Sequence, residues 1–143
     1  MKIGYCIGIN EMKKLDDCGL DYFETGLSTI AAMTEKEFYE AKCLIETLKT
    51  PVSVCNVLLP GSQKVVGPNY DAESCRNYLK LALSRAKQLG VKLIVFGSGA
   101  AKVIPEGFNR DKAMMQLVEF TRLLADAAEK YDILITIEAL RRE

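Results

Sequence analysis

The sequence contains no histidine and no tryptophan, and its 19 basic and 19 acidic residues balance to a formal net charge of zero. Histidine is the commonest metal ligand in proteins, so this chain cannot by itself supply a histidine-rich metal site. A neutral chain has no field of one sign that would attract nucleic acid or an anionic membrane surface. These absences argue against a nucleic-acid partner and against a polyanion-binding function.

The sequence also has few features of a secreted, disulfide-bonded or membrane protein. The cysteines number five, which is odd, and no two of them form a CxxC pair. The apolar runs are much shorter than the roughly 20 residues that span a bilayer, and the N-terminal MKIGYC leads directly into a strand-like run rather than into a signal peptide. We therefore expect a soluble, cytoplasmic protein with no membrane partner, whose cysteines mostly serve as small core residues.

Strand-like and helix-like segments alternate over all 143 residues, without a linker that would divide the chain. This alternation predicts one α/β domain of repeated βα units with parallel strands. Helices are expected over about 11–18, 34–50 and 71–89, and a fourth helix, with apolar residues from Met114 to Ala128 on one face, is expected after residue 109. Two long loops, 59–69 and 97–109, are expected at a binding face. Strands are expected at 3–9, 21–24, 52–58, 91–96 and 133–138.

Polar side chains stand where these strands end. The carboxyl ends of parallel strands gather at one edge, where α/β barrels and open α/β sheets build their sites. Glu138 is the most notable, because a carboxylate after the apolar run 133–137 is costly unless a metal, a cation or a substrate meets it. The alternative is an exposed glutamate paired with Arg141 or Arg142. The residues delivered to this edge are Asn10, Glu24, Asn56, Ser98 and Glu138.

Each of the other candidates has an ordinary structural interpretation beside the functional one. Glu24 can contact a substrate hydroxyl or end its strand in solvent. Asn56, inside an apolar run, needs a hydrogen-bond partner, either a neighbouring segment or a substrate. Ser98 lies in a Gly-Ser-Gly turn that lacks the spacing of nucleotide-binding loops, so a tight turn is favoured as its main role, with a ligand contact as a secondary one. Lys102 is a loop surface residue or a substrate contact.

The segment 95–99 (VFGSG), Lys102, the segment 104–108 (IPEGF), a helix and then 135–140 (ITIEAL) follow one another in this order. Together they resemble the sugar phosphate isomerase/epimerase family of xylose isomerase-like TIM barrels, which includes ketose 3-epimerases and inosose isomerases and dehydratases. The specific part of the resemblance covers 91–143. It implies a (β/α)8 barrel, which typically has about 250 residues, so residues 1–143 would be a single domain that is the truncated N-terminal part, about the first five strands.

The resemblance also implies a site. In the family a divalent metal (Mn, Mg, Co or Zn) is held by four side chains, and Glu138 matches the first ligand, which is also an acid/base residue. The substrate would be a small sugar or polyol, contacted by Glu24, Asn56, Ser98 and Lys102. Lys102 stands where many members have arginine, and Ala139 where many have proline. The other ligands have no counterpart in the sequence, so metal is expected in the full-length parent and this chain alone is expected to lack most of the site.

Three alternatives remain open at this point. The chain can be a non-catalytic half barrel that is stable only as a homo-oligomer, because its first and fifth strands leave two open sheet edges. An endonuclease IV-like metal-dependent hydrolase is disfavoured by the lack of histidine and by the neutral charge. An open flavodoxin-like sheet fits the number of strands, but no phosphate-binding loop follows the first strand.

Overall fold

The computed structural model describes residues 1–139, which form a parallel sheet of five strands in the order β1-β2-β3-β4-β5. Each strand pairs in parallel with the next one along the chain, as in the wall of an α/β barrel. The predicted α/β class with parallel βα units is therefore confirmed. The strands are β1 (Gly4–Cys6), β2 (Tyr22–Gly26), β3 (Val52–Asn56), β4 (Leu93–Phe96) and β5 (Leu134–Ile137).

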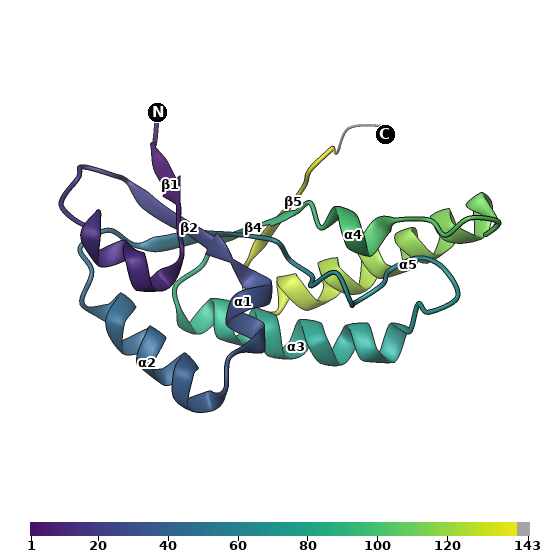
Figure 1. Ribbon diagram of the computed structural model, residues 1–143, viewed down its shortest axis with the longest axis horizontal. Helices are drawn as coiled ribbons and strands as arrows, with labels where there is room; N and C mark the ends of the chain where they lie inside the picture. The colour runs from purple at the N-terminus through teal and green to yellow at the C-terminus, as the bar shows by residue number, and fades with distance from the viewer. Residues whose placement is uncertain (140–143) are drawn as a thin grey trace.

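The helices gather on one side of this sheet. Figure 1 shows α1, α2 and α3 below the strands, α5 extending to the right, and β1 and β5 at opposite ends of the sheet. No helix in residues 1–139 is long and apolar enough to cross a membrane. The elements are η1 (Ile9–Lys14), α1 (Leu27–Ala32), α2 (Glu35–Glu46), α3 (Ala72–Gln88), α4 (Gly99–Lys102) and α5 (Arg110–Glu129).

Burial alternates along the strands because successive side chains point to opposite faces. In β2, Phe23 and Thr25 are buried under the helices, whereas Tyr22 and Glu24 are only half buried. The same alternation occurs in β4, where Phe96 is buried. The helix-covered face therefore carries the core, and the other face of the sheet is open. The largest core side chains are Phe23, Phe96, Phe120, Met12, Leu27, Ile30, Leu79 and Leu83.

The first predicted helix is wrong in type. Residues 9–14 form a 3-10 helix, and turns follow where an α-helix to residue 18 was expected. The carboxylate of Asp16 accepts hydrogen bonds from the backbone N–H groups of Lys49 and Thr50. Aspartate favours such bonds over a helix interior. The short helices α1 and α4 were not predicted, and β1 is shorter than expected because it pairs with β2 over only three residues.

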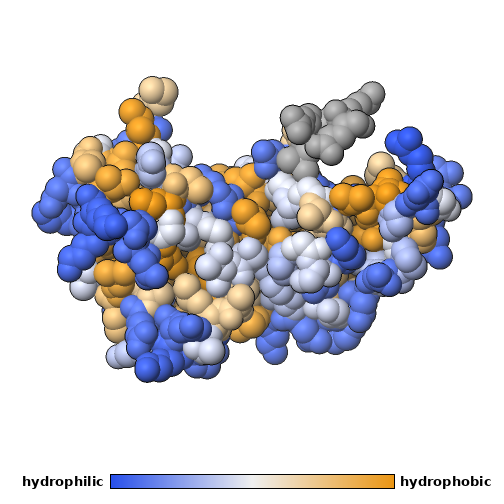
Figure 2. Space-filling view, viewed as in Figure 1, coloured by the Kyte–Doolittle hydropathy of each residue, from blue (hydrophilic) through white to orange (hydrophobic). Residues whose placement is uncertain are grey.

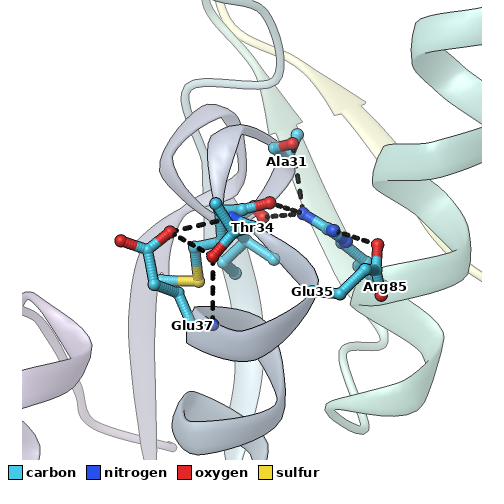
Figure 3. Close-up of polar contacts among 7 residues, drawn as sticks. Ala31, Thr34, Glu35, Glu37 and Arg85 are labelled. Carbon is cyan, nitrogen blue, oxygen red and sulfur yellow. Dashed lines mark hydrogen bonds and ion pairs between the residues drawn. The ribbon is translucent and has the colours of Figure 1, made fainter.

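The helix starts were predicted better, because capping depends on local chemistry. Thr34 and Glu37 form a capping box at the start of α2, with Glu37 accepting from the Thr34 N–H at 2.8 Å (Figure 3). Asp71 caps α3 by accepting from the N–H groups of Glu73 and Ser74. The helices α2 and α3 therefore begin where the sequence indicates.

The expectation that the cysteines are mostly core residues is wrong. All five are free thiols, and only Cys55 and Cys75 are buried. Burial raises the pKa of Cys55 to about 12, so this thiol is protonated at neutral pH. Cys6, expected in the core, is exposed because it pairs with Glu24 at the edge of the open sheet.

Replacing Asp16 by asparagine should remove an acid-sensitive part of the stability. The backbone hydrogen bond from Lys49, and then that from Thr50, lower the pKa of Asp16 from its ordinary 3.8. Because the folded pKa is lowered, this stabilisation is present above the ordinary value and is lost as the pH falls through the folded value. Urea denaturation from pH 7 to pH 2 should show wild type more stable at pH 7 and the two proteins converging in acid. Asp17→Asn is the control, and parallel curves for D16N and wild type would contradict the assignment.

Candidate functional site

Glu138 lies at the carboxyl end of β5, on the open face of the sheet. Its backbone N–H donates to the carbonyl of Phe96 at 3.3 Å, which extends the β4–β5 pairing beyond the strand. Because Thr136 pairs with Val95, Glu138 stands opposite Gly97, two residues further along both strands. The side chain is exposed, and its carboxylate lies directly over the backbone of Gly97.

Gly97 provides the room for this carboxylate. A Cβ atom placed on Gly97 would overlap Oε2 of Glu138 and would lie 3.4 Å from its Cδ. Gly97 is not among the glycines with a positive φ, so its backbone conformation is one that other residues adopt. The requirement for glycine here is therefore one of space beside Glu138.

Replacing Gly97 by alanine should displace the Glu138 carboxylate without a large loss of stability. The overlapping atom is the end of a flexible side chain, so we expect a change of less than about 1 kcal/mol in the free energy of unfolding. A crystal structure and urea denaturation would measure both effects. Gly8→Ala is the control, because a Cβ at Gly8 meets nothing within 4 Å. An unmoved carboxylate in G97A would contradict the account.

Lys102, at the end of α4, is a cationic residue near the end of β4. Its Nζ lies 4.8 Å from the centre of the Phe96 ring. Burial lowers the pKa of Lys102, and the negative charge of Glu138 partly opposes this by favouring the ammonium. The structure therefore brings two of the predicted site residues, Glu138 and Lys102, within electrostatic range of each other.

Ser98 forms the expected tight turn after β4. It has a left-handed backbone with φ of 42°, and its Oγ accepts a hydrogen bond from the Leu59 N–H at 3.0 Å. Val57, at the end of the neighbouring β3, is also left-handed with φ of 44°, which is rare for a β-branched residue. The carboxyl ends of β3 and β4 are thus both strained, and Ser98 joins them.

The two long loops, 59–69 and 97–109, are hydrogen-bonded to each other. Val65 donates its N–H to the carbonyl of Ala101 at 3.1 Å, and Lys64 donates to the carbonyl of Ala100 at 2.9 Å. Val65 and Val66 are buried in the core. The first loop therefore serves as packing that supports the second, in which Ser98 and Lys102 lie.

Asn56 and Glu24 lie on the open face, away from Glu138. The Asn56 Nδ2 donates to the sulfur of Cys6 at 3.1 Å, so the amide finds its partner on β1. Glu24 was expected at a strand end, but β2 continues to Gly26. In register Glu24 is level with Leu134, four residues before Glu138, or about 13 Å along the strands. The structure does not bring Glu24 and Glu138 together.

Among the described residues, no three histidine, cysteine, aspartate or glutamate side chains gather in a way that could hold a metal ion. Glu138 offers a single carboxylate there, and a lone carboxylate is a weak site for a divalent cation. Arg141 and Arg142, the alternative partners of Glu138, lie outside the described residues. The donor set present therefore does not fit a complete metal site.

A large hollow lies elsewhere on the described part of the chain. It has a volume of about 790 Å³, is formed between η1, α1 and α2, and includes Asn10, Thr29 and Glu37 in its lining. A second hollow of about 590 Å³ shares Asn10 and Thr29 and reaches Cys6 at the end of β1. Asn10, predicted at the carboxyl edge, lines both hollows, whereas Glu138 lines neither.

Two residues at this site were missed by sequence reasoning. Gly97 was interpreted as part of a turn, and Cys6 as a core residue, whereas they contact Glu138 and Asn56 respectively. A signal existed for Gly97, because matching the two strand ends places it opposite Glu138. For Cys6 no sequence signal existed, because its partner lies two strands away in the sheet.

Five parallel strands in chain order, with helices on one face and a carboxylate at the carboxyl edge of the other, define a part of an α/β barrel. The chain belongs to the xylose isomerase-like TIM barrel family, whose model matches residues 12–143. The family resemblance in the sequence is thereby confirmed, and the flavodoxin-like alternative is wrong. No curated protein matches the chain.

Solved structures agree with this fold. The chain is similar to the 3-keto-D-glucoside 4-epimerase YcjR from E. coli, with 17% identity over 99% of this chain and 57% of that one, and a TM-score of 0.71. It is similar to a D-psicose 3-epimerase crystallised in the presence of D-fructose, with 17% identity, coverage of 99% and 53%, and a TM-score of 0.77. D-psicose 3-epimerase with D-tagatose from Clostridium cellulolyticum H10 has 19% identity, coverage of 99% and 53%, and a TM-score of 0.76. The chain thus spans about half the length of these structures.

Proposed function

We propose that this chain is part of a divalent-metal-dependent isomerase or epimerase that acts on a small sugar, polyol or keto-sugar, and that Glu138 is a metal ligand and a proton-transfer group. The observation that carries the proposal is the position of Glu138, whose carboxylate lies on the open face at the carboxyl edge, over Gly97. Membership of a barrel family with epimerase neighbours supports it.

The proposed reaction needs more groups than the single carboxylate of Glu138. Proton transfer next to a carbonyl needs a base, an acid and a positive charge near the enolate oxygen. A divalent metal, when bound, supplies that charge. Glu138 can take or return the proton, and further carboxylate and imidazole ligands would come from the rest of a full barrel, of which residues 1–143 would be the N-terminal domain part.

Three further residues are proposed to contact the sugar from this edge. Asn56 donates through Nδ2 to Cys6, which leaves its carbonyl oxygen to accept from a sugar hydroxyl. Ser98 accepts through Oγ from Leu59, which leaves its hydroxyl proton to donate. Lys102 offers an ammonium to an anionic or hydroxyl group. Glu24, deeper on the same face, would contact a hydroxyl further from the reacting carbon.

The test is metal-dependent turnover of a ketose and inosose panel by the full-length protein, with the products separated by chromatography. We expect conversion of at least one ketose into its epimer when Mn²⁺ is present and none after chelation. The absence of metal-dependent turnover with every sugar of the panel would contradict the proposed function.

A second candidate is a non-catalytic half barrel that assembles with a further copy of itself. The edge strands β1 and β5 each pair on one side only within the described sheet. Large hydrophobic side chains at these edges are more than half exposed, namely Ile3, Tyr5, Leu134 and Ile137. Figure 2 shows hydrophobic residues at the surface around the β1 end of the sheet. A two-fold axis along the strands would place β5 of one copy beside β1 of the other, in parallel.

Sedimentation equilibrium separates the two candidates. Self-assembly through the edges predicts a concentration-dependent dimer or larger oligomer, and Leu134→Lys should weaken it by placing a charge at the β5 edge. A well-folded protein that stays monomeric at all concentrations would contradict this second candidate and leave the first unaffected.

A further inference from the structure

Gln116 of α5 holds the first long loop, 59–69, through both polar atoms of its side-chain amide. Its Oε1 accepts a hydrogen bond from the Gly67 N–H at 2.8 Å, and its Nε2 donates to the Gly67 carbonyl at 3.1 Å. Gln116 is half buried and Gly67 is buried, so water competes little for these two bonds. Because one amide meets both polar groups of one residue, it fixes the orientation of Gly67 as well as its position.

Gly67 is also a point where the two long loops meet. Its φ of 98° lies in the region that favours glycine, and a Cβ atom there would lie 3.0 Å from Cγ of Pro105 in the loop 97–109. Two residues earlier, Val65 donates its N–H to the carbonyl of Ala101 at 3.1 Å. The segment that Gln116 holds therefore lies directly against the second loop.

The other end of the first loop holds Ser98. Leu59 begins this loop, and its N–H donates to Oγ of Ser98 at 3.0 Å. Ser98 has a left-handed backbone with φ of 42°, a conformation that persists in a residue other than glycine only where surrounding contacts stabilise it. A loop that is fixed at Gly67 by Gln116 therefore also supports the hydroxyl of Ser98 at the carboxyl edge of the sheet.

We propose that Gln116 is a positioning residue for the carboxyl edge: by fixing Gly67 it holds the two long loops as one unit and keeps the Ser98 hydroxyl in place for a ligand. This rests on the proposed function, in which Ser98 contacts the sugar. Gln116 acts through the loops and takes no part in the proton transfer. A hydroxyl that is ordered before the ligand arrives costs less ordering on binding, so the effect of Gln116 falls on affinity.

The ordinary alternative is that Gln116 only anchors one residue of the loop on the surface of α5. In that case loss of its amide would loosen Gly67 alone, because the buried side chains of Val65 and Val66 would still hold the rest of the loop. The two interpretations differ at the Leu59 N–H, which bonds Ser98 at the other end of the loop.

The experiment measures amide hydrogen exchange by NMR in the chain of residues 1–143. In Gln116→Met the amides of Gly67 and Leu59 should exchange about tenfold faster than in wild type, relative to the core amide of Phe23, which donates to the carbonyl of Pro51. Gln116→Glu keeps an acceptor for the Gly67 N–H, so its effect should be intermediate, and it provides the measurement if Q116M fails to fold. Gln88→Met, at an exposed glutamine of α3, is the matched control and should exchange like wild type.

Faster exchange confined to Gly67, with Leu59 unchanged, would overturn the proposal. Kinetics of the full-length protein give a second readout: Q116M should raise KM for the ketose about tenfold and leave kcat within about threefold of wild type. A loss of kcat with KM unchanged would also overturn it. If the full-length wild type shows no turnover, the proposed function fails, and exchange at Leu59 still decides the role of Gln116.

Discussion

Replacing Arg85 by methionine is expected to lower the free energy of unfolding by about 3–5 kcal/mol, a large part of the roughly 5–15 kcal/mol that is typical of a domain. Arg85 is a buried residue of α3, where charged side chains are rarely found without partners. Methionine keeps much of the side-chain length and removes the charge and the hydrogen bonds.

The cost arises from the groups that Arg85 satisfies at the end of α1. Its Nη1 donates to the carbonyl of Ile30 at 2.9 Å, and its Nη2 donates to Glu35 at 2.6 Å (Figure 3). The guanidinium also lies 4.9 Å from the centre of the Phe38 ring. Without it, the carbonyl oxygens of Ala31 and Met33 lose the donor that Arg85 supplies, which costs about 1–3 kcal/mol each.

Glu35→Gln is the matched control. The Glu35 side chain is 86% exposed, so its ion pair with Arg85 is largely screened and its loss should cost less than about 1 kcal/mol. Urea denaturation at pH 7 gives both values. The more conservative change Arg85→Lys should have an intermediate effect, and it provides the measurement if R85M fails to fold. Equal effects of R85M and E35Q would show that the exposed ion pair, not the carbonyl contacts, is the source of the stability.

Replacing Glu138 by glutamine is expected to lower the rate of ketose epimerisation by the full-length protein at least about 100-fold, the usual contribution of a positioned acid or base. The amide has nearly the same shape as the carboxylate but cannot take a proton and is a poor metal ligand. Because Glu138 is exposed, the free energy of unfolding should change by less than about 0.5 kcal/mol. Steady-state kinetics at saturating Mn²⁺ measures the effect.

Glu24→Gln serves as the control for E138Q. Glu24 lies on the same face but about 13 Å nearer the amino ends of the strands, so its loss should mainly raise KM and leave kcat within about tenfold. If E24Q lowers kcat as much as E138Q does, the assignment of proton transfer to Glu138 is wrong.

The parts of this fold that follow from local chemistry could be predicted from the sequence. The cap residues Thr34 and Asp71 mark the starts of α2 and α3, and the apolar run before Glu138 marks β5. The position of Glu138 on the carboxyl edge follows from parallel strand order, which βα alternation requires. Glu138 and Lys102 were therefore placed in one region from the sequence, and the structure brings them within electrostatic range.

The remaining features depend on contacts between distant segments. Asp16 lies in the part of the first predicted helix that does not form. Its side chain accepts instead from backbone groups 33 and 34 residues away, which the local sequence does not indicate. Arg85 falls on the buried stripe of α3, between Ala82 and Leu89, and this position was the sequence signal for a buried charge. The acceptors of Arg85 lie on α1, which the sequence did not predict, because six residues carry too little periodicity to indicate a helix.

The central claim is that Glu138 transfers the proton on the carbon next to a sugar carbonyl. Proton NMR in D₂O tests it most directly, because deuterium enters that carbon at each transfer even when no net product accumulates. With a panel of ketoses and Mn²⁺, the full-length protein is predicted to exchange this hydrogen in at least one sugar, and the E138Q variant to exchange it at least about 100-fold more slowly. Exchange at equal rates in wild type and E138Q, or no exchange by the wild type with any ketose, would contradict the account.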